Sequence, residues 1–420
     1  GPTESIFQPE WGPDGVLYWA SDGSGWWNLV RDDAAIAPIE AEIGTAQWVF
    51  GMARYAVLDD GRIATVVTAD GRQRIALVTG SQYHSIEFAH DTVAPYLAVD
   101  GTTLWCVAGD AATPMGLVGV DVDSGQVDVV RRNFTTSIDP AYFSMPEAIE
   151  APTTGGGITH AFYYPPANPE FVAPEGELPP LIVMSHGGPT AATTTDLDLA
   201  IQFWTTRGFA VVDVNYRGSI GYGREYRAAL EGQWGIVDTD DCIAAARHLA
   251  DIEQVDARRM AIRGGSAGGY TTLCALAFHD VFAAGASYFG VADCAALAEH
   301  THKFESRYLD SMIGPYPQAA DLYRARSPLH HAEGISCPVL LLQGADDKVV
   351  LPEQAEVMVQ ALSRRGIPHA YILFAGEGHG FRKAENIIAA NGAELSFYGQ
   401  VFGFAPAGDV PRIALVPTPG

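Results

Sequence analysis

The stretch that decides the fold is Gly264-Gly265-Ser266-Ala267-Gly268, which has the pattern Gly-x-Ser-x-Gly. The apolar run 260–262 precedes it, and the helix-compatible run 271–277 follows it. This order predicts a strand, a tight turn and a helix, with the serine hydroxyl presented on a strained turn at the top of a sheet. Glycine suits such a turn because a Cβ would clash with the neighbouring strand and helix. Ser266 is therefore a candidate nucleophile.

Composition and charge exclude several classes of function. The chain has 420 residues, of which 48% are hydrophobic, so it can form two or three domains with sizeable cores. It has no run of about 18 apolar residues, and its first residues do not resemble a signal peptide, so we expect no membrane partner. The net charge of −25 repels phosphate backbones, so we expect no nucleic-acid partner.

Cysteine usage indicates a reducing compartment. The five cysteines are dispersed, and no Cys-x-x-Cys pair occurs, which is typical of a cytoplasmic protein without disulfides or a thiolate zinc site. Glu299-His300-Thr301-His302 contains metal-ligating residue types, but no His-Glu-x-x-His motif occurs. We therefore expect no metal and no cofactor. The cysteines are Cys106, Cys242, Cys274, Cys294 and Cys337.

The first third of the chain has the pattern of β-hairpins. Short β-rich runs alternate with Asp-Gly turns, such as those at 60–61 and 100–101. These turns are strong hairpin signals, and the pattern recurs about every 40–45 residues, which is the period of a propeller blade. We expect a partial β-propeller of about three blades in residues 1–143, with a small β-sandwich as the alternative.

The remaining residues, 144–420, have the pattern of an α/β domain. Strand-like runs alternate with helical stretches, which predicts a mostly parallel sheet with helices on both faces and the hairpin-like segment 148–164 at its edge. The expected strands are 180–184, 210–214, 259–262, 284–288, 339–342 and 370–374. The expected helices are 197–207, 238–251, 271–279, 352–365 and 384–402.

Two motifs downstream of Ser266 complete a possible acyl-transfer site. Gly344-Ala345-Asp346-Asp347 follows one expected strand, and Gly376-Glu377-Gly378-His379-Gly380-Phe381 follows the next. The order Ser, Asp, His is that of α/β-hydrolases, whose partners stand at the carboxyl ends of strands.

The predicted roles follow from this order. Ser266 is the nucleophile, His379 is the general base and then the acid, and Asp347 fixes the tautomer of His379. Asp346 competes with Asp347 for the last role. Glu377 is a weaker alternative, because it is too close in sequence to reach the ring of His379 easily.

Other residues are expected to surround the nucleophile. His186-Gly187-Gly188-Pro189 follows the expected strand at 180–184, in the position of the loop that supplies one oxyanion N–H, and Ala267 would supply the other. We predict an apolar, partly aromatic acyl pocket from Tyr288-Phe289 and Phe304, with ordinary core packing as the alternative for the first pair.

Taken together, these motifs resemble the prolyl oligopeptidase family of serine peptidases, and more closely its acylaminoacyl-peptidase and dipeptidyl-aminopeptidase branch. The resemblance covers residues 146–405. It implies an α/β-hydrolase catalytic domain, favours Asp347 over Asp346 and suggests Gly188 as the second oxyanion donor. The matching segments are His186-Gly187-Gly188-Pro189, Asn215-Tyr216-Arg217-Gly218-Ser219-x-Gly221-Tyr222-Gly223, Gly264-Gly265-Ser266-Ala267-Gly268-Gly269-Tyr270, Ser327-Pro328, Gly344-x-x-Asp347-x-x-Val350 and Gly378-His379-Gly380-Phe381.

The resemblance implies a serine peptidase that hydrolyses short peptides through an acyl-enzyme. A carboxylic-ester hydrolase on the same scaffold is one alternative, and an inactive fragment that acts as an assembly partner is another. Family members carry a longer propeller, and about three blades cannot close a ring. We therefore expect a partner for this chain. It is either the missing N-terminal propeller fragment, retained after cleavage ahead of Gly1, or another copy of the chain in a homo-oligomer.

Overall fold

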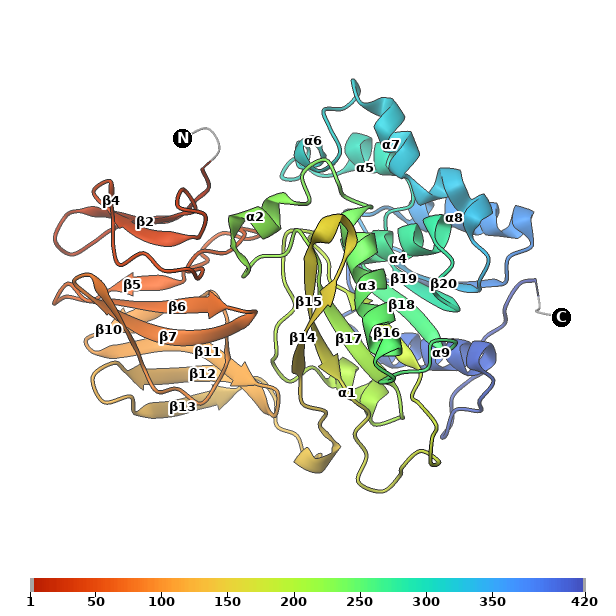
Figure 1. Cartoon of the computed structure of the whole chain (residues 1–420), viewed down its shortest axis with the longest axis horizontal. Helices are drawn as coiled ribbons and strands as arrows, with labels where there is room; N and C mark the ends of the chain where they lie inside the picture. Colours follow the sequence, from red (N-terminus) through yellow and green to blue (C-terminus); the bar gives the residue numbers. More distant parts are fainter. Residues whose placement is uncertain (1–3, 418–420) are drawn as a thin grey trace.

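The computed structural model describes residues 4–417, which form three small antiparallel sheets followed by one large mixed sheet (Figure 1). The third small sheet ends at Arg132, and the large sheet begins at Glu147. We propose that the boundary between two domains, 1–143 and 144–420, lies in this connection. The terminal residues 1–3 and 418–420 of these two domains lie outside the described range.

Each small sheet is built from consecutive strands that pair antiparallel, as the Asp-Gly turns predict. The first contains β1 (Ile6–Trp11), β2 (Leu17–Ser21), β3 (Asn28–Arg31) and β4 (Ala34–Ala35). The second contains β5 (Tyr55–Val57), β6 (Ile63–Ala69), β7 (Arg72–Thr79) and β8 (Gln82–Ser85). The third contains β9 (Thr92–Val93), β10 (Ala98–Asp100), β11 (Thr103–Asp110), β12 (Thr113–Asp121) and β13 (Val127–Arg132).

The three sheets stack on one another through their apolar faces. Tyr18 and Leu29 of the first sheet share a core cluster with Val67 of the second. Val66, the neighbour of Val67, points the opposite way and packs with Leu104 of the third sheet. A middle sheet buried on both faces is the arrangement of a propeller blade between two others, so the prediction of a partial propeller of three blades is confirmed.

The large sheet runs in the order β14-β15-β17-β16-β18-β19-β20-β21. β14 and β15 form an antiparallel hairpin at one edge, and the six strands from β17 onwards run parallel to one another. This confirms the predicted α/β-hydrolase architecture. The strands are β14 (Glu147–Pro152), β15 (Ile158–Tyr164), β16 (Leu181–Ser185), β17 (Ala210–Asn215), β18 (Met260–Gly265), β19 (Ala284–Tyr288), β20 (Val339–Gly344) and β21 (His369–Phe374).

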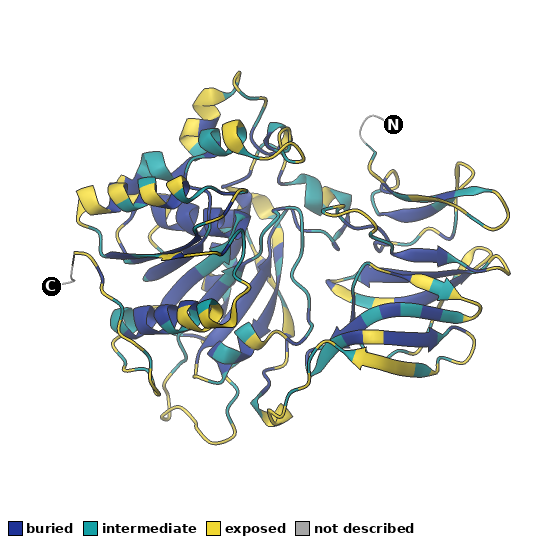
Figure 2. Cartoon of the chain, turned by 180° about the vertical axis from the view of Figure 1, so that it is seen from behind, coloured by how far each residue is buried: buried dark blue, intermediate teal, exposed yellow. Residues whose placement is uncertain are grey.

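Helices cover both faces of this sheet, because its parallel strands are apolar at successive positions. One face packs against α3 (Val237–Asp251), α4 (Ala267–Phe278) and α8 (Pro352–Arg365). The other packs against α1 (Leu199–Thr205) and α9 (Ala384–Phe402). Figure 2 shows the resulting buried central strands.

The sequence did not predict the short helices that flank the carboxyl edge of the sheet. They are α2 (Gly223–Ala228), α5 (Cys294–His300), α6 (Leu309–Met312) and α7 (Ala320–Arg326). Single turns of 3-10 helix occur at Pro140–Tyr142 and Thr154–Gly156, and a longer kinked one at Pro328–Gly334. Helices α5, α6 and α7 lie between β19 and β20, above the sheet in Figure 1. No helix within residues 4–417 is long and apolar enough to cross a membrane.

Buried ion pairs join the small sheets to the α/β part at α2, the helix that lies between them in Figure 1. Arg227 of α2 donates to Asp22 at 2.5 Å and to Glu42 at 3.1 Å, and both carboxylates come from the small sheets and are buried. Glu42 also accepts the backbone N–H of Gly221. The guanidinium of Arg227 lies 3.9 Å from the ring centre of Trp27. Burial raises the pKa of Glu42, so its negative charge depends on this partner.

We predict that Arg227→Ala destabilises the protein by about 3–5 kcal/mol, because two buried carboxylates lose the cation that is hydrogen-bonded to both. Denaturant unfolding would measure the loss. Arg258→Ala is the control, since this arginine is 92% exposed and its pair with Asp256 is long, at 3.7 Å. The control should change stability by less than about 0.5 kcal/mol. Equal effects of the two variants would contradict the proposed role of Arg227.

Candidate active site

The turn between β18 and α4 holds Ser266 in a strained conformation. Its backbone has φ 57° and ψ −120°, in the left-handed region that non-glycine residues rarely occupy. A Cβ on Gly268 would stand 1.9 Å from the carbonyl oxygen of Ser185 on β16, and one on Gly264 would stand 2.4 Å from the backbone of Gly268. The glycines therefore allow strand and helix to approach, and the hydroxyl of Ser266 is held above the sheet edge.

His379 and Asp347 lie beside this hydroxyl, as the sequence predicts. Asp347 follows β20 and His379 follows β21, so both loops leave the same edge of the sheet as Ser266. His379 Nε2 is 2.9 Å from Ser266 Oγ, and His379 Nδ1 is 2.8 Å from Asp347 Oδ2. An ionised carboxylate can only accept, so Nδ1 carries the proton and Nε2 is free to accept from the serine.

The carboxylate of Asp347 is buried and held from several sides. Its Oδ1 accepts the backbone N–H groups of Val349 and Val350 at 2.9 and 3.0 Å. Its Oδ2 accepts from Gln343 Nε2 at 3.3 Å in addition to His379. These bonds fix the carboxylate and, through it, the plane of the imidazole.

The two alternative carboxylates occupy other positions. Asp346 is exposed. Glu377 is buried, and it accepts the backbone N–H groups of Arg382 and Lys383 and the side-chain amide of Asn386. The hydrogen bond from Asn386 is the largest of the effects that lower the pKa of Glu377. Through these hydrogen bonds, Glu377 fixes the His379 loop to the start of α9.

The predicted oxyanion loop lies against the serine turn. A Cβ on Gly187 would be 3.6 Å from Ser266 Cβ, and the neighbouring Gly188 has φ 121°. His186 of this loop is stacked on Tyr216, whose hydroxyl donates to the carbonyl oxygens of residues 186 and 189. Burial lowers the pKa of His186 to about 4, so its imidazole is neutral at neutral pH and serves to hold the loop.

A small cavity of about 40 Å³ lies beside Ser266. Gly188 and Ala267, the two predicted oxyanion donors, both line it. Its other walls are mainly apolar, with Glu305 as the single carboxylate among the lining residues. The remaining lining residues are Pro189, Trp234, Val291, Leu297, Thr301, Tyr308, Leu309, Val349 and Val350. Of these, Pro189, Thr301 and Val350 lie in stretches that the sequence analysis had singled out, and no pocket role was predicted for them.

The three aromatic residues predicted to line the acyl pocket do not line this cavity. Tyr288 is buried, and its hydroxyl donates to Glu394 on α9 at 2.5 Å. The ring of Phe289 lies 4.8 Å from that of His379, so this residue is near the site but covers the base. Phe304 is 59% exposed. A substrate role for Phe289 stays a prediction.

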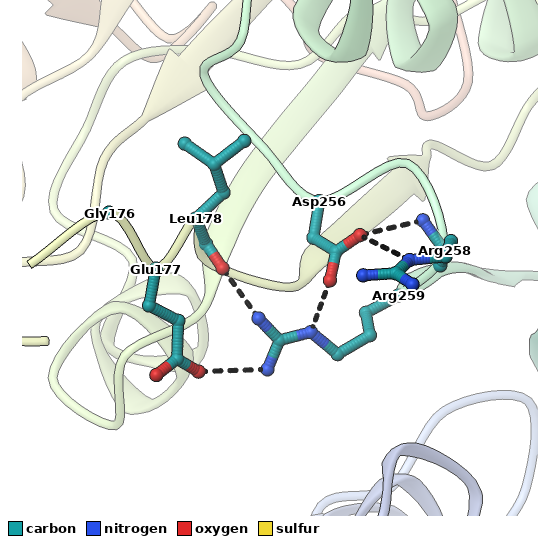
Figure 3. A pocket seen from close by; sticks show the side chains of 6 residues that line it. All are labelled: Gly176, Glu177, Leu178, Asp256, Arg258 and Arg259. Carbon is teal, nitrogen blue, oxygen red and sulfur yellow. Dashed lines mark hydrogen bonds and ion pairs between the residues drawn. The ribbon is translucent and has the colours of Figure 1, made fainter. Parts of the chain in front are cut away.

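A wider cavity lies elsewhere (Figure 3). It has about 640 Å³ and stands at the amino ends of β16 and β18, the edge opposite Ser266. Arg259 in its wall donates to Asp256, Glu177 and the carbonyl oxygen of Leu178, so its charge is already satisfied. We assign this hollow no part in the site.

Within residues 4–417, no three His, Cys, Asp or Glu side chains are grouped as metal ligands would be. The five cysteines are free and buried.

The comparisons with known proteins agree with this geometry. Residues 195–405 match the model of the prolyl oligopeptidase family. The chain is 34% identical over 230 residues to dipeptidyl aminopeptidase BIII of Pseudoxanthomonas mexicana, covering 53% of this chain and 33% of that protein. It is 30% identical over 212 residues to the acylamino-acid-releasing enzyme of Arabidopsis thaliana, covering 49% and 28%.

Solved structures match over nearly the whole chain. A puromycin-hydrolyzing peptidase of Mycobacterium tuberculosis is 45% identical with a TM-score of 0.96, and a puromycin hydrolase is 42% identical with a TM-score of 0.95. Each alignment covers 99% of this chain but 64% of the other, so the chain spans about two thirds of these proteins and about a third of the curated relatives. The chain belongs to the prolyl oligopeptidase family.

Proposed function

We propose that this chain is a serine peptidase that hydrolyses short peptides through an acyl-enzyme. The observation that carries the proposal is the continuous hydrogen-bonded chain from Ser266 through His379 to the buried Asp347. The Ser266–His379 distance allows proton transfer, and the His379–Asp347 distance allows the hydrogen bond that orients the imidazole.

The roles follow from the positions of these groups. His379 takes the proton of Ser266 as the hydroxyl attacks the carbonyl carbon of the substrate, and then gives it to the leaving amine. Asp347 stabilises the imidazolium that forms. The backbone N–H groups of Gly188 and Ala267 bind the oxyanion, and the helix that starts at Ala267 adds its positive end. Water then releases the acyl group by the same steps.

The three stacked sheets favour a peptidase over an ester hydrolase. They belong to the chain and are fixed to α2 by buried ion pairs, and a solved structure that matches 99% of the chain is described as a puromycin-hydrolyzing peptidase. The names of the relatives include both an aminopeptidase and acylamino-acid-releasing enzymes. We propose peptides with either a free or a blocked amino terminus as the substrate class, in a reducing cytoplasm that suits five free cysteines.

We further propose that the open propeller recruits a partner. Large apolar side chains are exposed on its outer strands, including Trp11 on β1, which is 70% exposed, and Val129 and Val130 on β13. Such edges pair with other chains unless they are covered. A complementing propeller fragment is the first candidate, and self-association is the second.

Replacing the nucleophile tests the site. Ser266→Ala should lower kcat by about 10⁶-fold while the fold is kept, because no other group can form the acyl-enzyme. Turnover of an aminoacyl anilide and labelling by a fluorophosphonate would measure the loss. Activity above a few per cent of wild type, without labelling of another serine, would contradict the assignment.

A pair of neighbouring aspartates gives a matched control. Asp347→Asn should lower kcat by about 10⁴-fold, because the amide stabilises the wrong tautomer of His379. Asp346→Asn changes the exposed neighbour and should leave kcat within about twofold. If Asp346→Asn gave the larger loss, the roles of the two residues would be reversed.

A substrate panel separates the three functions considered. A peptidase should cleave acyl-aminoacyl or aminoacyl anilides as well as nitrophenyl esters. Cleavage of the esters alone would support the ester hydrolase, and no turnover with either class would support an inactive assembly partner.

Light scattering on protein from its natural source tests the partner. We expect the native mass to exceed that of the denatured 44.8 kDa chain, either through a second chain that co-purifies or through further copies of the same chain. A stable monomer of 44.8 kDa would contradict both versions of the proposal.

A further inference from the structure

A loop of the small sheets reaches the wall of the cavity beside Ser266. The loop connects β4 to β5, and both of its ends are fixed. Glu42 exchanges two backbone hydrogen bonds with Thr68, and the buried Arg54 donates to the carbonyl oxygen of Ile43 at 2.8 Å. Its tip, around Phe50, is exposed. The loop is therefore a short arm on a rigid base.

Trp48 on this arm contacts the α/β part at two points. Its indole Nε1 donates to the carbonyl oxygen of Thr190 at 3.1 Å. Its ring meets that of Tyr308 edge to face, with 5.5 Å between centroids and 76° between planes. The indole thus offers a polar contact at one point and an apolar contact at the other.

Both partners of Trp48 belong to the surroundings of Ser266. Tyr308 lines the small cavity, and Thr190 follows Gly188-Pro189, which line it too. The hydroxyl of Tyr308 lies 2.7 Å from Thr190 Oγ1 and accepts the N–H of Thr190 at 3.2 Å. Each of three residues therefore contacts the other two: Trp48, Tyr308 and Thr190. Together they connect the oxyanion loop to one wall of the pocket.

Little else fixes this wall from the side of the small sheets. Next to Trp48, residues 45–47 face Thr190 and Met312 across a cavity of about 400 Å³. The segment between α5 and Tyr308 is largely exposed. From the side of the small sheets, Trp48 is therefore the contact with this wall that the structure shows.

We infer that Trp48 is a positioning residue of the active site: it holds Tyr308 and the 188–190 loop, and thereby sets the selectivity of the acyl pocket. This rests on the proposed peptidase function and adds to it that the pocket wall is shared between the two parts of the chain. Trp48 touches no reacting atom, so the chemical step itself remains with Ser266, His379 and Asp347.

The test compares two anilide substrates that carry a small and a large acyl side chain, alanine and phenylalanine. Trp48→Ala should move the ratio of their kcat/KM values at least about threefold towards one, because a wall that is free to move no longer discriminates by size. Trp48→Phe keeps the ring against Tyr308 and loses the indole N–H. It should keep the ratio within about twofold, because the ring still packs against Tyr308.

Phe50→Ala is the matched control. Phe50 lies on the same arm, is 95% exposed and should leave the ratio unchanged. A shift as large as that of Trp48→Ala would assign the effect to the arm in general and overturn the inference. An unchanged ratio in Trp48→Ala, with an unchanged melting temperature, would also overturn it.

A double mutant and a label complete the test. Trp48→Ala and Tyr308→Phe should change kcat/KM non-additively, whereas additive effects would show that the two residues act independently and would contradict the inference. Fluorophosphonate labelling of wild-type Ser266 reports the proposed function separately. If wild type is labelled and active but the ratio of kcat/KM values is unchanged in the variants, the peptidase function still holds. Only the proposed role of Trp48 is then rejected.

Discussion

The close approach of β16 to the turn between β18 and α4 is the contact on which the site depends. A Cβ on Gly268 would stand 1.9 Å from Ser185 O, so the approach requires glycine, and it forces Ser266 into its strained conformation. A second close backbone contact also requires glycine, because a Cβ on Gly344 would stand 2.3 Å from the carbonyl oxygen of Gly378. It brings the Asp347 loop against the His379 loop. The hydrogen-bonded chain follows from these two backbone contacts.

The sequence pattern predicted those helices and strands whose limits depend on neighbouring residues in the chain. The residue limits of β19, α8 and α9 agree with the sequence. A short apolar run marks β19, Pro352 and Gly366 mark α8, and Gly403 marks the end of α9. Helices α5–α7 were missed, since each has at most seven residues and gains its stability from packing over the sheet. The position of Tyr288 away from the small cavity has a related reason. Tyr288 was assigned to it, but its partner Glu394 lies 106 residues away, and no local signal reveals such a contact.

Directed polar contacts, rather than a continuous apolar core, join the small sheets to the α/β part. Arg227 binds two buried carboxylates, Trp48 binds a backbone carbonyl, and a cavity of about 400 Å³ lies beside both. Charged partners that are buried must be matched exactly in position to offset desolvation. Such an interface therefore fixes the orientation of the two parts through a few side chains. Loss of one of these side chains should weaken that orientation strongly.

The same site is held from the opposite side by α9. Glu377 ties the His379 loop to the first residues of this helix, and Glu394 further along binds Arg263 of β18 at 2.9 Å. One helix therefore couples the strand before the nucleophile to the loop of the base, without help from the small sheets. The pocket wall, in contrast, needs Trp48. The reacting groups are thus positioned within the α/β part alone, while the fit of the acyl group depends on both parts of the chain.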